Sequence, residues 1–274
     1  MSMTHRHASD RGWPADQAHG LRRMFAASGL RIVPVVANPH MPFSGLILER
    51  LCAALAERGA HTLVVDAADS APAADELATM GLADCVTTLA PAVSYLAARG
   101  LPLRYVDAHG STSSFLQAAV DAAPRAEVVL VHAGASDLAR LFARQTLVTQ
   151  VLPLLLADDR PASVTHAYAA MKWLALRARL RVHHLVLEAS AASARTARIA
   201  EQLARCADTF LGALLQGWTL VDPIGHGHDA PPEPLRRLAR TLLAAGHADV
   251  PAAVAALPSP RLRPAGVSGA LALN

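Results

Sequence analysis

Short apolar segments alternate along the chain with longer segments in which apolar residues recur every three or four positions. The short segments predict buried strands, and the longer ones predict helices that cover a sheet. Strands are predicted at residues 30–37, 62–66, 103–107, 127–132, 151–157, 182–188 and 215–221. Helices are predicted at residues 46–58, 112–123, 161–174, 194–211 and 234–245. This alternation predicts a three-layer α/β domain around a mostly parallel central sheet of about seven strands.

Both ends of the chain lack this alternation. Residues 1–28 open with polar residues and then place Leu21 and Phe25 on one face of a helix, which predicts a flexible tail with a short amphipathic helix. Residues 249–274 consist mainly of Ala, Pro, Gly and Ser, and they predict a second tail. The domain is therefore expected at residues 29–248.

The composition fits this architecture and excludes several other classes of protein. Of the 274 residues, 53% are hydrophobic but only 4% are aromatic, as expected for helices that cover a sheet. No apolar run approaches the roughly 20 residues of a membrane span, and no secretory signal is present, so we expect a cytoplasmic protein. Leu235, Leu238 and Leu242 form an apolar stripe that fits either a membrane surface or the sheet. We expect packing on the sheet and at most peripheral membrane contact.

Charge, cysteine and lysine usage limit the chemistry further. The net charge is +3, but the arginines are scattered, so we expect no nucleic-acid binding. Cys52, Cys85 and Cys206 are odd in number and far apart, which favours reduced thiols over disulfides or a zinc site. Lys172 is the only lysine, so a mechanism that needs a phosphate-binding lysine has one candidate.

The loop after the first predicted strand stands where a P-loop protein binds phosphate. Such a loop needs glycines, a lysine and a Ser or Thr, so that backbone N–H groups and a cation surround the phosphates. Here it consists of Asn38, Pro39, His40, Met41, Pro42, Phe43, Ser44 and Gly45. The prolines lack N–H donors and the bulky residues obstruct a close approach of phosphate. We therefore expect no cofactor, and ATP with magnesium only if this altered loop retains affinity.

This loop and the segments around it resemble the MinD/ParA family of deviant-Walker ATPases. Within that family, residues 13–245 resemble the flagellar number and placement regulators of the FlhG/FleN type. Residues 35–45 fall where the family has its S-G-K-G-G-V-G-K-[ST] loop, which puts Pro39 and Ser44 at the positions of its two lysines. The resemblance implies a P-loop NTPase fold with a degenerate phosphate loop.

Three further segments carry the resemblance through the domain. Asp66 matches the first switch aspartate of the family, and His132 stands at the acidic position of its Walker B strand. Residues 154–168 look like the family pattern V-V-T-x-P-E-P-T-S-[IL]-x-D-A-Y. From the residues alone, Asp66 is either a residual switch carboxylate or a structural group, and we favour the structural role. Asp158 and Asp159 are interpreted as solvated loop carboxylates.

The tail contains a second specific match. Residues 16–22 fit the D-Q-A-x-x-L-R motif that FlhG/FleN proteins carry ahead of the ATPase domain. In that family the motif docks on the signal-recognition-particle-type GTPase FlhF and stimulates GTP hydrolysis. The partner-binding residues implied here are Asp16, Gln17, Ala18, Leu21, Arg22 and Phe25.

These observations predict a regulator of flagellar number or placement that binds and stimulates FlhF. We expect a monomer that neither binds nor hydrolyses ATP, has no catalytic residue or metal of its own, and is recruited to the flagellar base at the inner membrane. Flagellar C-ring components are further expected partners. Two alternatives stay open: an active MinD/ParA-type ATPase, and a ParA-like accessory protein of another envelope machine such as cellulose secretion.

Overall fold

One eight-stranded sheet runs through the computed structural model, which describes residues 29–74, 81–143, 151–190, 192–222 and 230–244. The strand order is β3-β4-β2-β5-β1-β6-β7-β8. All neighbouring strands are parallel except β3 and β4. The strands are β1 (Arg31–Val36), β2 (Thr62–Asp66), β3 (Val86–Ala90), β4 (Val93–Ala97), β5 (Val128–Ala133), β6 (Leu154–Asp158), β7 (Val182–Glu188) and β8 (Leu214–Val221).

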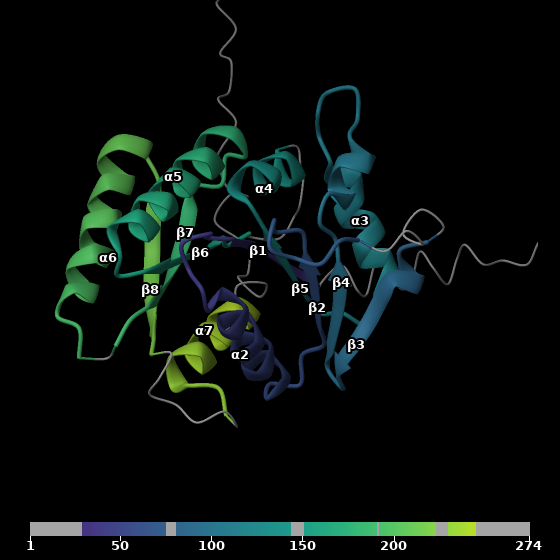
Figure 1. Ribbon diagram of the computed structural model, residues 1–274, viewed down its shortest axis with the longest axis horizontal. Helices are drawn as coiled ribbons and strands as arrows, with labels where there is room; N and C mark the ends of the chain where they lie inside the picture. Colours follow the sequence, from purple (N-terminus) through teal and green to yellow (C-terminus); the bar gives the residue numbers. More distant parts are fainter. Residues whose placement is uncertain (1–28, 75–80, 144–150, 191, 223–229, 245–274) are drawn as a thin grey trace, which may run out of the picture.

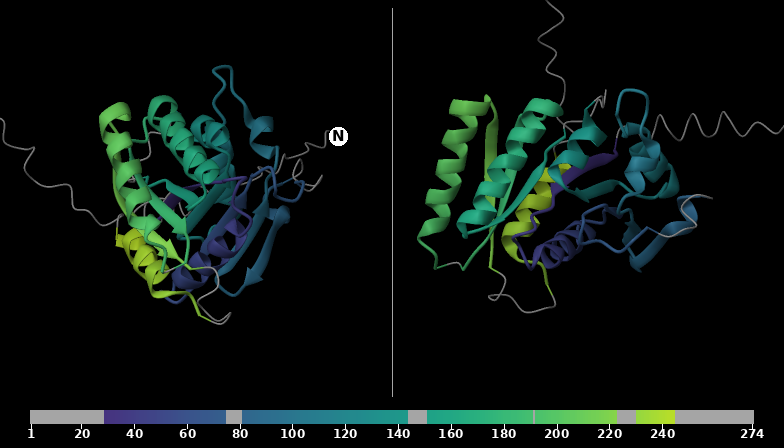
Figure 2. Two further views of the ribbon diagram at one scale, coloured as in Figure 1. Left: turned by 60° about the vertical axis from the view of Figure 1, so that its left-hand side comes forward. Right: turned by 45° about the horizontal axis from the view of Figure 1, so that its top comes forward.

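Helices cover both faces of the sheet, which confirms the expected three-layer α/β class (Figure 1, Figure 2). They are α2 (Ser44–Ala56), α3 (Ser113–Ala122), α4 (Ala135–Phe142), α5 (Pro161–Arg177), α6 (Arg195–Cys206) and α7 (Glu233–Ala244). Helices α3 to α6 share one hydrophobic cluster with the sheet, and α2 and α7 share the other. Neighbouring residues of a strand therefore enter different clusters, as Val36 and Val35 of β1 do.

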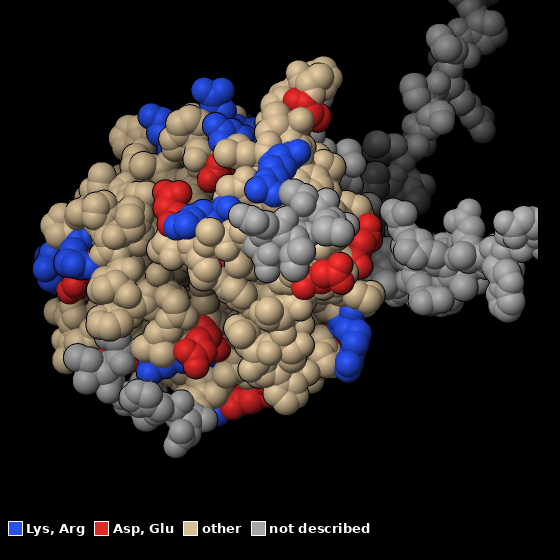
Figure 3. All heavy atoms as spheres, turned by 45° about the vertical axis from the view of Figure 1, so that its right-hand side comes forward, with Lys and Arg blue, Asp and Glu red and all other residues tan. Residues whose placement is uncertain are grey.

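The apolar stripe of α7 packs on the sheet as expected. Leu235, Leu238 and Leu242 are at most 2% exposed and belong to the cluster that α7 shares with α2. No helix within the described ranges is long and apolar enough to cross a membrane. On the face seen in Figure 3, acidic and basic side chains are interspersed rather than gathered by sign.

The edge of the sheet at β3 and β4 differs from the sequence prediction. Residues 103–107 are not a strand, because Gly100, with φ 73°, ends the preceding segment and Leu101–Tyr105 forms a 3₁₀ helix with Pro102 in its first turn. The edge is instead an antiparallel hairpin of β3 and β4, which raises the number of strands to eight. Strand β3 is mostly exposed, and Thr87 and Thr88 interrupt the apolar run on which the prediction depended.

The topology brings the ends of several strands together at one edge. Strand β1 lies between β5 and β6, and the chain crosses from one side of it to the other after β5. In open α/β sheets, ligands bind at the carboxyl ends of the strands beside such a switch point. The β1–α2 loop and the last residues of β2, β5, β6 and β7 all lie at this edge.

Candidate functional site

The β1–α2 loop is tied to the neighbouring β6–α5 segment through the side chain of Asn38. This side chain is buried, and its Nδ2 donates to the Leu156 carbonyl at 2.8 Å and to the Ser163 carbonyl at 3.1 Å. Its Oδ1 accepts a hydrogen bond from the backbone N–H of His40 at 3.1 Å. Nε2 of His166 also lies 3.2 Å from the Ala37 carbonyl oxygen. The loop is thus held by specific hydrogen bonds rather than left open toward a ligand.

Arg160 makes a second connection across the loop. Its Nε donates to Oδ2 of Asp158 at 2.7 Å, and another N–H of the guanidinium donates to the carbonyl oxygen of His40. A hollow of about 370 Å³ lies beside this contact, lined by Pro39, His40, Pro42, Arg160 and Ala162. Asp158 is buried and paired with Arg160, so the interpretation of Asp158 as a solvated carboxylate was wrong. Its place at the end of a central strand puts it inside the edge instead of on an outer loop.

The side chains of Asp66 and His132 contact each other at the edge. Asp66 is the last residue of β2, and His132 is the next-to-last residue of β5. Nδ1 of His132 lies 2.9 Å from Oδ1 of Asp66, and the side chains are only 5% and 17% exposed. Tyr95 donates its hydroxyl to Oδ2 of Asp66 at 3.2 Å, and the Ala68 N–H donates to Oδ1 at 3.3 Å. Burial alone raises the pKa of Asp66, but the bond and charge of His132, together with these two donors, lower it overall. In turn, burial and the Asp66 charge raise the pKa of Tyr95 to about 12.

A pair of acidic residues ends the two strands on the other side of β1. Asp158 of β6 and Glu188 of β7 are in register, and both are buried. Burial raises the pKa of Glu188, the Asp158 charge raises it further, and the nearby Arg160 and Arg50 only partly oppose this. Sequence reasoning missed Glu188, although an acidic residue at the end of a predicted apolar strand was a usable signal.

The residues predicted from the sequence fall into three groups. Asn38, His40, Asp66 and His132 come together at the carboxyl edge. Phe43 is exposed, Ser44 and Gly45 form the first turn of α2, and Lys172 lies on the exposed face of α5, away from the loop. The partner-binding residues predicted in residues 16–25 lie outside the described residues.

The sequence and the fold were compared with known proteins. No protein-family profile and no curated protein matches the sequence. The MinD cell division protein of Aquifex aeolicus has a similar structure, with a TM-score of 0.52 and 12% identity over 78% of this chain and 97% of that chain. Cobyrinic acid a,c-diamide synthase of Mycobacterium smegmatis, with bound ADP and magnesium, has a TM-score of 0.51 and 16% identity over 80% and 96%.

The chain has a MinD-type fold. In a P-loop fold, the β1–α2 loop surrounds the phosphates, and an acidic residue on a neighbouring strand holds the magnesium ion. In this chain the first place is the loop at residues 38–45, and the second is the pair of Asp66 and His132 at the ends of β2 and β5.

The loop does not fit the phosphates of ATP. Pro39 and Pro42 supply no N–H, and the Asn38 amide is already bonded to β6 and α5. The carbonyl of His40 accepts a hydrogen bond from the guanidinium of Arg160. Arg160 therefore brings a positive charge to the loop, but this guanidinium is already bonded to the loop itself. Residues 39–42 therefore offer no free backbone N–H to a phosphate, because the N–H groups of His40 and Met41 are bonded to Asn38.

The metal position does not fit magnesium either. Asp66 is engaged by an imidazole, a phenol and a backbone N–H, and His132 replaces the acidic group of β5. Magnesium prefers oxygen ligands that can complete an octahedron. Among the described residues, no three His, Cys, Asp or Glu side chains are arranged to hold a metal ion.

Proposed function

We propose that the chain regulates flagellar number or placement by binding a signal-recognition-particle-type GTPase, FlhF, and stimulating its GTP hydrolysis. The observation that carries this proposal is the D-Q-A-x-x-L-R motif at residues 16–22, ahead of a MinD-type fold. The poor fit of the edge to magnesium and ATP supports a role that depends on binding rather than on an ATPase cycle. The chain then acts as a monomer at the flagellar base, where C-ring components are further partners.

The proposed activity assigns separate tasks to the residues of the motif. Gln17 orients the attacking water in the partner's active site, as glutamines do in other GTPases. Leu21 and Phe25 lie four residues apart and anchor an amphipathic helix in an apolar groove of the partner. Arg22 meets an acidic or phosphate group there.

A peptide that covers residues 10–28 tests this proposal directly. We expect the peptide to accelerate GTP hydrolysis by a purified FlhF-type GTPase, because stimulation needs only the docked motif. Gln17→Ala should abolish the acceleration and retain binding, whereas Leu21→Ala should weaken binding by about tenfold or more through the loss of an apolar anchor. Hydrolysis is followed by phosphate release, and binding by fluorescence anisotropy.

The matched control is His19→Ala, at a position that the motif leaves variable, and this peptide should bind and stimulate like the unchanged one. If the peptide leaves the GTPase rate unchanged, or if Gln17→Ala and Leu21→Ala are equal binding defects, the activator role is wrong. An envelope machine other than the flagellum then becomes the better candidate for the partner.

A further inference from the structure

Helix α5 has an unusual distribution of side-chain size. The residues that it buries are mostly small: Ser163, Ala167, Ala170 and Ala175, with Met171 and Leu174. Its outer face instead presents Trp173, which is 47% exposed, and Leu176, which is 62% exposed. Large apolar side chains on the solvent side of a helix do nothing for the core, and clusters of them mark interaction surfaces.

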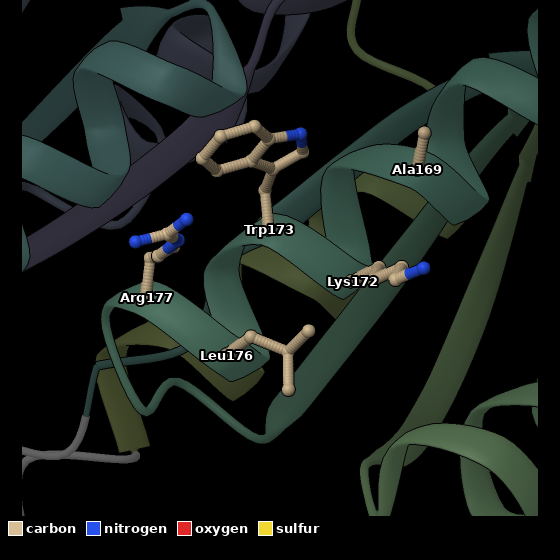
Figure 4. Close-up of a pocket in the computed structure, with 5 residues that line it drawn as sticks. All are labelled: Ala169, Lys172, Trp173, Leu176 and Arg177. Carbon is tan, nitrogen blue, oxygen red and sulfur yellow. The ribbon is translucent and has the colours of Figure 1, made fainter.

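These side chains form a shaped surface rather than isolated contacts. The guanidinium of Arg177 lies 5.3 Å from the centre of the Trp173 ring, in a cation–π arrangement that holds the indole in place. A hollow of about 410 Å³ is lined by Ala169, Lys172, Trp173, Leu176 and Arg177, which we call the α5 patch. Figure 4 shows Trp173 and Arg177 projecting on one side and Lys172 and Leu176 on the other. The small side chain of Ala169 leaves room for a side chain from outside.

The charge of this segment limits what can occupy the patch. Of the five residues that line the patch, Lys172 and Arg177 are basic and none is acidic. A second copy of the chain would place the same cations against each other, which is unfavourable. The tails are not complementary either, because residues 1–28 have four Arg and two Asp, and residues 245–274 have two Arg and one Asp.

We propose that the α5 patch binds an acidic amphipathic segment of another protein. An apolar side chain of that segment enters the hollow beside Trp173, and its carboxylates meet Lys172 and Arg177. The concave lining favours a protruding side chain over the flat surface of a bilayer. This surface lies on the domain and is independent of residues 16–25, so it serves a partner additional to the proposed GTPase.

A library of random short peptides, displayed and selected against the purified full-length chain, tests the proposal. Enriched peptides should be acidic, with apolar residues between the carboxylates. When the peptides are synthesised, Trp173→Ala and the double variant Lys172→Glu/Arg177→Glu should each weaken binding by about tenfold or more in fluorescence anisotropy. Binding should also decrease with added salt.

Two control variants match these substitutions elsewhere on the surface. Leu103→Ala removes an exposed leucine of the 3₁₀ helix, and Arg125→Glu reverses an exposed charge before β5, so both should bind like the wild type. Circular dichroism verifies that each variant is folded. The proposal is overturned if no peptide is enriched, if the peptides show no acidic bias, or if Trp173→Ala binds them equally well. It is also overturned if Trp173 is instead required for sedimentation with phosphatidylglycerol vesicles or for self-association.

Discussion

Asp66 and His132 show how individual residues keep their positions in a fold while their chemistry changes. The family resemblance matched Asp66 to a switch aspartate and His132 to the Walker B position, whereas the residues alone favoured a structural role for Asp66. In the structure they face each other at 2.9 Å, with Tyr95 completing the cluster. The favoured structural role for Asp66 is consistent with these bonds, since each of its oxygens accepts a hydrogen bond from within the protein.

The substitution Asp66→Asn tests that structural role. Because it removes a buried charge-assisted bond, it should lower the free energy of unfolding at pH 7 by about 1–3 kcal/mol in urea denaturation. The lowered pKa of Asp66 means that this stability is present above the unfolded value of 3.8 and is lost as the pH falls toward the folded pKa. Added magnesium should shift the midpoint of urea denaturation neither in the wild type nor in Asp66→Asn. A midpoint that rises with magnesium in the wild type and not in Asp66→Asn would instead identify Asp66 as a metal ligand.

The sequence predicts the location of these residues better than their partners. Parallel strands end at the same edge, so the strand pattern places Asp66 and His132 at that edge, and the pairing of β2 with β5 in the structure brings them together. The hydrogen bonds of Tyr95 and Arg160 depend on β4 and on the turn into α5, which apolar periodicity does not resolve. Tyr95 and Arg160 could therefore be recognised only once the strands were placed in three dimensions.

At the scale of elements, the pattern of apolar residues predicts a strand correctly where that strand is central in the sheet. Residues 62–66 and 182–188 are strands at the predicted bounds, because continuous apolar runs are typical of strands covered on both faces. The β3–β4 hairpin was missed because an edge strand needs no such run. Helix α4 was also missed, since its eight residues are too few to establish a clear helical period.

Strands β7 and β8 bury two histidines, and their packing predicts a pH dependence. His183 and His184 are buried in β7, and Nε2 of His184 lies 2.8 Å from Oγ1 of Thr219. Gly217 faces that ring, where a Cβ atom would lie 3.3 Å from Cε1 of His184. Burial lowers the pKa of each histidine from 6.5 to about 4, because the charged imidazole is disfavoured away from water.

The chain should therefore lose stability as the pH falls from 6.5 to 4. Over that range the unfolded histidines bind protons and the folded ones do not, so protonation favours the unfolded state. Between pH 6.5 and 5 each of these two histidines should cost about 1.5 kcal/mol of the free energy of unfolding, measured by urea denaturation. His183→Leu should reduce this loss, and the remainder comes from His184 and from the partly buried His166, whose pKa burial also lowers. An unchanged pH dependence in that variant would mean that His183 is protonated in the folded protein.

At the scale of the whole molecule, the MinD-type fold does not depend on the groups that bind ATP in such a fold. The two hydrophobic clusters and the strand order are built from apolar residues of the strands and helices. The loop and the strand ends contribute polar contacts at one edge, and Asn38, Asp66 and His132 belong to neither cluster. A fold of this kind is therefore able to retain its architecture as the chemistry of its edge changes.

That separation leads to a prediction about ATP. We expect magnesium and ATP at millimolar concentration to give no heat of binding in calorimetry and no shift of the thermal unfolding midpoint, because a bound ligand would raise the midpoint. Arg160→Ala frees the carbonyl of His40 but restores no N–H at Pro39 or Pro42, so this variant should also fail to bind. Asp66→Asn changes the metal position instead of the loop, and as the matched control it should likewise give no heat of binding. Micromolar affinity, or a dimer that forms only with ATP in sedimentation, would show that other groups at this edge neutralise the phosphates. The active MinD-type ATPase would then replace the regulator as the better proposal.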